Sequence, residues 1–511
     1  MANRTNRNEP AHPHLLDRDG DDRDGGNRDS DVRYNDGRDG GDRYGGERDG
    51  DKRDGRELDG DERAHGRRGV RARRGDDAAL KAPQPLLADP SDLLFYAALA
   101  LLPVDGTTVG IPLPYWTPLS PWLFLAYALV NARHLRVFAR RYLPFVLFPL
   151  LLVLVSFYGW TTIGLHGWAA ARSIGSVILG LACLASLEIA LRVKRLPWRP
   201  MVTVLVAAYW FAFLVGVAQW AGVRWHVQGI SQFFARLMYR NYTWDRPQFL
   251  FAEPSYIGMH LFGVLLPIYW LARDRRIAVL IPVFAFGSMV MGAGTRIVID
   301  TVVAGVIWLI VSINFKRRGA TIGAASGIAV AAAGAVAAIF LDPRLNKLAS
   351  DGLLKGDGSM SARIFHMLAP AWTWKHDPWH TLLGWGAGNI SNAVRVGYWG
   401  ARRWYDARGG LVNAEIKGLV NPPADTFTMS GYVSFITEFG LLMAVLLAVV
   451  VAAGITIRHA WSRKMVCWLV LVAYLYVQFE AYAFYALPLL VFVLTALKMS
   501  RFIGREEYLG S

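Results

Sequence analysis

Charged residues gather immediately before a long apolar segment in the middle of the chain. The stretch FLFAEPSYIG, residues 249–258, places Glu253 and Pro254 at the start of that segment, and Arg240 and Arg246 precede it. Ionisable groups near hydrocarbon are costly, so they usually face a cavity, a partner or a substrate. This stretch is therefore the first place to look for function.

A second group of such residues lies in SARIFHMLAPAWTWKHDPWHTLLGWGAGN, residues 361–389. Arg363 and His366 are three positions apart and share one helix face. The apolar residues around them predict an amphipathic helix along a membrane surface, which Pro378 ends. Three glycines, at positions 384, 386 and 388, then allow a tight turn where backbone can approach a ligand. The alternative is an interfacial helix whose arginine only reaches toward water.

The rest of the chain predicts the elements that position these residues. Of its 511 residues, 53% are hydrophobic and 13% aromatic, and the mean hydropathy is +0.26. The apolar residues form blocks of roughly 20, the length that crosses a bilayer. We therefore expect an all-α polytopic membrane protein with about 12 transmembrane helices. The predicted blocks are 92–112, 118–132, 142–164, 173–191, 200–220, 255–271, 277–293, 297–314, 319–341, 428–456, 465–480 and 483–499.

Basic residues set the expected orientation. They cluster at 133–141, 192–199, 273–276, 316–318 and 458–464. Twelve spans with both termini cytoplasmic put every cluster on one side, as the positive-inside rule requires. The two long connections, residues 221–254 and 342–427, then lie on the extracytoplasmic face. Because long loops on one face usually carry function, the active face is expected there.

The first 80 residues differ in composition from the remainder, residues 81–511. They carry a net charge of about −3, against about +18 for the rest, and are rich in Arg, Asp and Gly. Such a segment cannot offset chain entropy by burying a core, so we expect a disordered cytoplasmic tail. Its arginines are matched by aspartates and its aromatic residues are few, which argues against nucleic acid as a partner. Cys183 and Cys467 lie in apolar blocks and are expected to be buried thiols.

Four segments, in order along the chain, resemble one known family. Arg363, Trp372 and HDPWHTLLGWGAGN resemble the large extracytoplasmic loop of the O-antigen ligase and O-antigen polymerase (Wzy-type) family. FLFAEPSYIG, GAGTRIVID (292–300) and MSGYVSFITEFGLL (429–442) resemble segments at the starts of its membrane helices. The ligase branch carries His where this chain has Met429. That departure favours the polymerase branch. It also means that no residue of this chain matches the histidine that has the family's best-defined catalytic role.

The resemblance implies glycan transfer between undecaprenyl diphosphate carriers at the outer face of the bacterial cytoplasmic (inner) membrane. The lipid-linked oligosaccharide would be both donor and acceptor, and a chain-length regulator is a further candidate partner. Cations must hold the diphosphate leaving group, and a base usually deprotonates the attacking hydroxyl. Arg296 and Arg363 match family positions and suit bidentate phosphate binding. Glu253 is the expected base, and the further expected substrate-binding residues are Arg240, Arg246, His366 and His376.

Structural alternatives stay open for several of these residues. Glu253 before Pro254 also suits a carboxylate that stabilises a helix N-terminus. Arg296 lies one turn from Asp300 and could simply pair with it. Glu438 suits a packing role at least as well as catalysis. The HDPWH segment lacks clean ligand spacing, so we expect no metal and no cofactor.

Two rival functions also stay open. An O-antigen ligase-like enzyme would move the glycan onto a lipid A core or a protein. A flippase or transporter of lipid-linked sugars should place ionisable residues at mid-membrane in broken helices, often in repeated halves. In this chain the charges concentrate on one face and no repeat is visible, which favours the enzyme.

Overall fold

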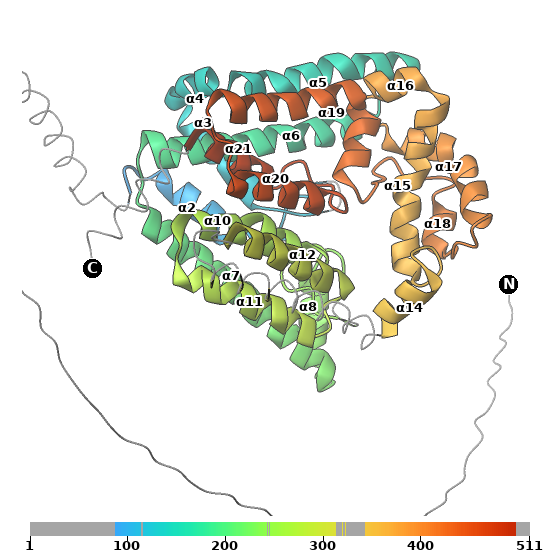
Figure 1. Cartoon of the computed structure of the whole chain (residues 1–511), viewed down its shortest axis with the longest axis horizontal. Coiled ribbons are helices and arrows are strands. Elements are labelled where there is room, and N and C mark those ends of the chain that lie inside the picture. Colours follow the sequence, from blue (N-terminus) through green and yellow to red (C-terminus); the bar gives the residue numbers. More distant parts are fainter. Residues whose placement is uncertain are drawn as a thin grey trace, which may run out of the picture. The chain divides into compact units, whose positions relative to one another are not determined.

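The computed structural model describes residues 87–496, except 114–115, 243, 245 and all but three residues of 313–342. All described residues belong to the unit Ala82–Ser511. The predicted disordered tail and nearly all of the predicted span 319–341 lie outside them. Helices and turns make up the described residues, with two isolated β-bridges and no strand (Figure 1), which confirms the all-α class.

Five helices are long and apolar enough to cross a membrane. They are α5 (Leu143–Thr162), α6 (Gly167–Glu188) continued by the π-helix η2 (Ile189–Val193), α7 (Trp198–Arg224), α12 (Thr295–Ser312) and α19 (Gly431–Ile457). Two shorter apolar helices follow the same pattern: α3 (Ser120–Val130), and the run of α9 (Tyr256–Gly258), π-helix η3 (Met259–Leu265) and α10 (Leu266–Ala272).

Other predicted spans correspond to helices shorter than the roughly 20 residues that cross hydrocarbon. They are α2 (Asp92–Ala100), α11 (Arg275–Val290), α20 (Arg463–Tyr476) and α21 (Ala486–Ala496). In place of the predicted span 92–112, α2 ends at Ala100 and the chain continues in turns. The structure therefore establishes a membrane-type helical bundle without fixing twelve crossings.

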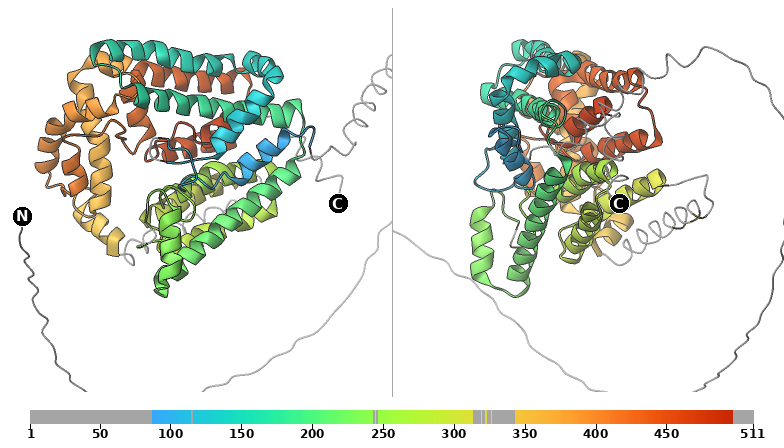
Figure 2. Two further views of the ribbon diagram at one scale, coloured as in Figure 1. Left: turned by 180° about the vertical axis from the view of Figure 1, so that it is seen from behind. Right: turned by 90° about the vertical axis from the view of Figure 1, so that its left-hand side faces the viewer.

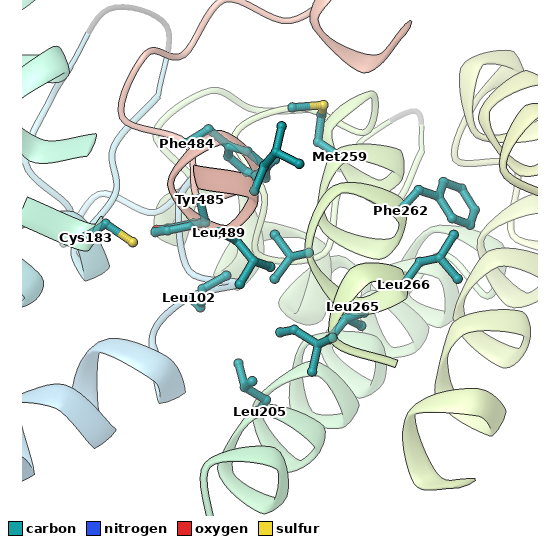
Figure 3. Packing of buried hydrophobic residues seen from close by; sticks show 14 of the residues in the cluster. Leu102, Cys183, Leu205, Met259, Phe262, Leu265, Leu266, Phe484, Tyr485 and Leu489 are labelled. Carbon is teal, nitrogen blue, oxygen red and sulfur yellow. The ribbon is translucent and has the colours of Figure 1, made fainter. Parts of the chain in front are cut away.

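The helices pack around a large apolar core. Helices α5, α6 and α19 lie side by side, while α7, α11 and α12 pack together elsewhere in the bundle (Figures 1 and 2). Between α7 and the η3–α10 run, the core includes Leu205, Leu265 and Leu266, with Phe484 and Tyr485 from the turn before α21 (Figure 3). Burying these apolar side chains against one another holds the short helices in place.

The predicted extracytoplasmic connection 342–427 is itself helical where the structure describes it. It contains α14 (Pro343–Asp351), α15 (Gly358–His376), α16 (Pro378–Leu383), α17 (Ile390–Asp406) and α18 (Ala414–Gly418). Helices α15 and α17 pack on each other around Phe365, Tyr398 and Tyr405. The helix predicted around Arg363 is thus confirmed, and its own small core fixes its orientation.

The glycine turn after α16 holds this helical insertion against α19, because the Trp385 and Gly386 amides donate to the carbonyl oxygens of Thr437 and Glu438. Gly384, Gly386 and Gly388 all have φ between +81° and +87°, as the tight-turn prediction requires. Helix α19 is interrupted at Gly440, where φ is +80°. A Cβ on Gly384 would lie 2.3 Å from the Glu438 carbonyl oxygen, so only glycine permits this approach.

Glu438 fastens the same turn through its carboxylate. Its Oε1 accepts a hydrogen bond from the Gly388 amide at 2.8 Å. Its Oε2 accepts from the Ser173 hydroxyl at 2.6 Å and the Tyr482 hydroxyl at 2.9 Å. Both oxygens are therefore engaged, which favours the packing role for Glu438.

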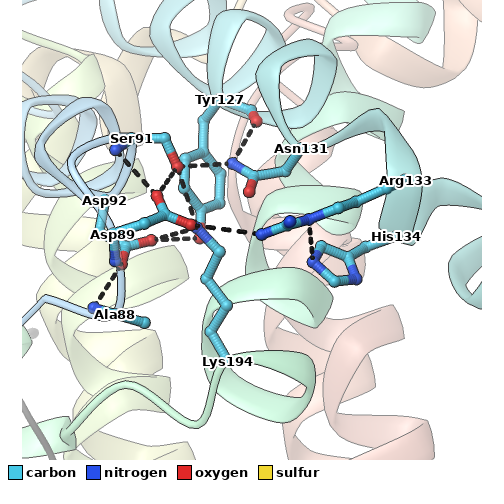
Figure 4. A network of polar contacts seen from close by, with 9 residues as sticks. All are labelled: Ala88, Asp89, Ser91, Asp92, Tyr127, Asn131, Arg133, His134 and Lys194. Atoms are coloured by element: carbon cyan, nitrogen blue, oxygen red, sulfur yellow. Dashed lines mark hydrogen bonds and ion pairs between the residues drawn. The ribbon is translucent and has the colours of Figure 1, made fainter.

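A polar network ties the start of α2 to α3 and to the end of η2 (Figure 4). The Lys194 ammonium lies 2.7 Å from Asp92 Oδ1 and 2.8 Å from Asp89 Oδ2, and the Tyr127 hydroxyl donates to Asp92 at 3.0 Å. The hydrogen bond with Lys194 is the main cause that lowers the pKa of Asp89 to about 2. Arg133, from a predicted cytoplasmic cluster, joins at 3.7 Å from Asp89. This network belongs to the end of the bundle where the predicted basic loops gather.

Candidate functional site

Four segments that are far apart in sequence meet around one cavity of about 140 Å³, which we call the main cavity. They are the segment before α9, the start of α12, the start of α15 and the end of α20. Four of the seven residues expected to form the site line this cavity: Arg246, Glu253, Arg296 and Arg363. The sequence pattern placed them in three separate segments, and the fold brings them together.

Hydrogen bonds to buried side chains hold the segment that carries Glu253. Gln219 of α7 donates to the Phe249 carbonyl at 2.7 Å, and its amide oxygen accepts from the Phe249 amide at 2.8 Å. Asp105 accepts from the Ala252 amide at 2.9 Å. Phe249 has φ of +61°, a conformation that a non-glycine residue adopts only when its surroundings enforce it.

Behind this segment lies a buried chain of polar groups. His260 Nε2 lies 2.9 Å from Asp105 Oδ2, and His260 Nδ1 lies 2.7 Å from the Tyr209 hydroxyl. Asp105, Gln219 and His260 were not predicted as site residues. Each is a polar residue within an apolar block or at its edge, and that was the signal that could have identified them.

Glu253 and Arg363 form an ion pair at the wall of the cavity. The Arg363 guanidinium donates directly to Glu253 Oε1. Both side chains are nearly buried, with 5% of Glu253 and 13% of Arg363 exposed. Arg363 lies in the second turn of α15, whose start is capped by Asp357, a further lining residue that accepts from the Ser359 amide at 2.9 Å. A guanidinium in this position can exchange its carboxylate partner for an anionic ligand.

Arg296 has extensive structural bonding. It lies 3.4 Å from Asp300 Oδ2, and its guanidinium donates to the carbonyl oxygens of Leu475 and Gln478 at the end of α20. Asp300 in turn accepts from the Tyr474 hydroxyl at 2.7 Å. Basic side chains commonly satisfy the last carbonyls of a helix in this way. The geometry thus supports the pairing alternative for Arg296, while leaving it on the wall of the cavity.

Arg246 lines the same cavity with fewer bonds. Its guanidinium carbon lies 5.5 Å from the centre of the Tyr242 ring. Its Nε is buried and has no hydrogen-bond partner among the described residues. Gly294 faces it, and a Cβ there would lie 3.4 Å from its guanidinium. An unsatisfied buried donor beside two other arginines is a good position for an anion.

Arg240 and His366 lie beside the main cavity rather than in its wall. The Arg240 guanidinium is 5.2 Å from the Phe427 ring, and the His366 ring stacks on the same phenyl ring at 5.0 Å. His366 also contacts Glu415 at 3.0 Å, and this hydrogen bond is the main cause that lowers the pKa of Glu415. The charges of Arg363 and Arg240 lower it further. Both arginines are therefore close enough to favour the charged form of the Glu415 carboxylate.

His376 is not brought to the site. It is exposed at the last position of α15, roughly 20 Å along the helix from Arg363 at 1.5 Å per residue. Its neighbour His380 is engaged elsewhere, because Nδ1 lies 2.5 Å from Asp377 and Nε2 lies 2.8 Å from the Thr162 hydroxyl. Within the part of the chain that the structure describes, no group of three or more His, Cys, Asp or Glu side chains could hold a metal ion.

The charged lining of the main cavity balances three arginines against three carboxylates: Arg246, Arg296, Arg363, Glu253, Asp300 and Asp357. An anion would bind here by replacing carboxylates as partners of the guanidinium groups. Arg363 and Arg246 are best placed for this exchange, because Arg296 is also bonded to two backbone carbonyls. The arrangement can hold phosphate oxygens and stabilise charge that develops on them.

Arg296→Ala should lower the yield of folded protein, because it leaves buried Asp300 without its cation and α20 without its cap. Breaking a buried ion pair from one side costs about 3–5 kcal/mol. Adding Asp300→Ala should recover part of the yield, and Arg246→Ala, which breaks no such pair, serves as the control. Size-exclusion profiles of the detergent-solubilised variants measure this. Equal yields for Arg296→Ala and Arg246→Ala would contradict the structural role of Arg296.

Comparisons with known proteins add no family assignment. No protein-family model matches the sequence, and no curated protein matches it.

Proposed function

We propose that the chain is an integral membrane glycosyltransferase of the O-antigen polymerase type. It would join glycans carried on undecaprenyl diphosphate, with one lipid-linked oligosaccharide as donor and another as acceptor. The observation that carries this proposal is the meeting of Arg246, Glu253, Arg296 and Arg363 at one cavity. Three of these residues lie in segments that resemble the family, and the fourth, Arg246, lies just before one of them.

The chemistry follows from the residues that line the cavity. In the transfer, an acceptor hydroxyl attacks the anomeric carbon of the donor sugar, and the bond from that carbon to the diphosphate oxygen breaks. Negative charge develops on the leaving diphosphate. Guanidinium groups of Arg363 and Arg246 stabilise that charge through bidentate, charge-assisted hydrogen bonds. Glu253, which pairs with Arg363, orients that guanidinium and gives it up to the phosphate. The predicted role of Glu253 as base requires this pair to open.

The proposed topology is consistent with the position of the site. With about twelve crossings and both termini cytoplasmic, every segment around the main cavity falls at the extracytoplasmic end. The polar network around Lys194 and Arg133 falls at the cytoplasmic end, with the basic clusters. We therefore propose that the protein lies in the bacterial inner membrane, with its transfer site open to the outer face.

The topology is tested by single cysteines that replace two exposed residues, Leu353 of the proposed external insertion and Ser462 before α20. The native Cys183 and Cys467 are buried, so background labelling should be low. A membrane-impermeant maleimide added to intact cells lacking an outer-membrane barrier should label Leu353→Cys and spare Ser462→Cys. Labelling of position 462 but not 353 would reverse the orientation.

Arg363→Ala should lower polymer formation per inserted protein by on the order of 10²-fold or more. Removing one hydrogen-bond donor that stabilises negative charge in a transition state has an effect of this size in other enzymes. Arg363→Lys should restore little, since a point charge cannot reproduce the guanidinium fork. Arg402→Ala is the matched control, because Arg402 pairs with Asp406 on the surface of α17, outside the cavity.

The measurement is the polysaccharide profile of a deletion strain that carries each variant. Wild type and Arg402→Ala should produce long polymer, and Arg363→Ala should leave single repeats. Normal chain length with Arg363→Ala would contradict the diphosphate site. Accumulated free polymer in the deletion strain would indicate the ligase alternative, and lipid-linked repeats held at the cytoplasmic face would indicate the flippase.

A further inference from the structure

A small cavity adjoins the main cavity, a second small cavity lies next to the first, and Glu480 lines both small cavities. The connecting cavity, about 10 Å³, shares Glu253, Arg363 and Gln478 with the main cavity and is also lined by Met429 and Glu480. The Arg172 cavity, about 30 Å³, lies on the other side of Glu480. Its polar lining comprises Arg172, Ser173, Ser176, Asp425, Thr426, Glu438, Glu480 and Tyr482.

Glu480 is held firmly by backbone. Its Oε2 accepts hydrogen bonds from the Thr428 amide at 2.6 Å and the Met429 amide at 2.7 Å, and the Thr428 hydroxyl lies at 3.4 Å. All three contacts are made by the same oxygen, Oε2. Met429 has φ of +66°, so the backbone is constrained where it binds the carboxylate. Glu480 lies in the turn between α20 and α21 and is partly exposed.

Two other carboxylates that line these cavities, Glu253 and Glu438, are bonded to groups that hold them in place. Glu253 bonds to the Arg363 guanidinium. Glu438 uses both oxygens, on the Gly388 amide and on two hydroxyls, and is only 2% exposed. Glu480 combines a fixed position, accessible surface and a location between the two polar cavities. A group that removes a proton needs these properties.

The Arg172 cavity offers an approach for a hydroxyl group. By its volume it holds about two water molecules, which suits a hydroxyl with its hydration rather than a whole sugar ring. Arg172 Nε is buried without a hydrogen-bond partner among the described residues, and the guanidinium lies 3.8 Å from Asp425. The Asp425 side chain is 59% exposed and marks the mouth of the cavity. The ring of an acceptor would stay outside this mouth.

We propose that Glu480 is the general base of the transfer and that the acceptor hydroxyl reaches it through the Arg172 cavity. This inference rests on the proposed glycosyl transfer. The acceptor O–H proton passes to Glu480, and the acceptor oxygen bonds to the anomeric carbon of the donor sugar. The bond from that carbon to the diphosphate oxygen breaks, and its electron pair leaves with the diphosphate, which the arginines of the main cavity hold. The proton later leaves Glu480 for solvent.

The test uses full-length protein in nanodiscs, with a synthetic undecaprenyl-diphosphate-linked oligosaccharide as donor and acceptor. Glu480→Gln keeps an oxygen that accepts the Thr428 and Met429 amides but cannot take a proton. Its transfer rate per folded protein should fall about 10²–10⁴-fold, the usual contribution of a general base. Substrate binding, measured by titration, should be unchanged. The rise of rate with pH that a base produces should disappear.

Glu480→Asp should transfer the glycan more slowly than wild type, but its transfer rate should still rise with pH. This variant replaces Glu480→Gln in the test if Glu480→Gln does not fold. Asp406→Asn is the control and should behave as wild type, because it removes an exposed carboxylate of α17 that lines none of the three cavities. If wild type transfers the glycan and Glu480→Gln has the same rate and pH profile, the role of Glu480 is overturned while the proposed function stands. Absence of transfer by wild type overturns the proposed function and this inference with it.

Discussion

The ion pair between Arg363 and Glu253 is the interaction on which the site depends. It joins the helical insertion between α12 and α19 to the segment that leads into α9, and it lies in the wall shared by the main and connecting cavities. A nearly buried pair of this kind is a poor stabiliser compared with apolar packing, because both charges lose water. In the proposed function, the pair serves to hold the Arg363 cation ready for an anionic ligand. The rigid surroundings of both partners, with Gln219 and Asp105 on one side and α17 on the other, fix the geometry of that exchange.

The sequence predicted the helical class, the helix around Arg363 and the glycine turn, because each has a local physical signature. Apolar blocks indicate helices in lipid, Arg363 and His366 at helical spacing indicate one face, and the glycines indicate positive φ. It also predicted four residues that the fold places around one cavity. Charge beside an apolar segment indicated Glu253 and Arg246, whereas Arg296 and Arg363 were expected from their match to family segments.

Other features depended on contacts that sequence spacing does not encode. Helix α2 stops at Ala100 because the chain that follows it turns to pair with the segment around Leu250. The backbone amides of Asp105 and Gly106 both donate to the Leu250 carbonyl oxygen. The bonds from Arg296 to the end of α20 join residues about 180 positions apart. His376 shares a helix with Arg363 but lies at its far end, so proximity in sequence was misleading there. Glu480 could not be distinguished from any other acid in an apolar block until the fold placed it between two cavities.

The central claim is that this membrane protein forms a glycosidic bond at the expense of a lipid diphosphate linkage. The most direct measurement counts undecaprenyl diphosphate released and repeats joined by purified wild-type protein in sealed vesicles, with lipid-linked oligosaccharide in the outer leaflet. The account predicts one diphosphate carrier released for each bond formed, and products that differ by whole repeats. Movement of intact lipid-linked oligosaccharide across the vesicle membrane, with no carrier released and no longer product, would contradict it.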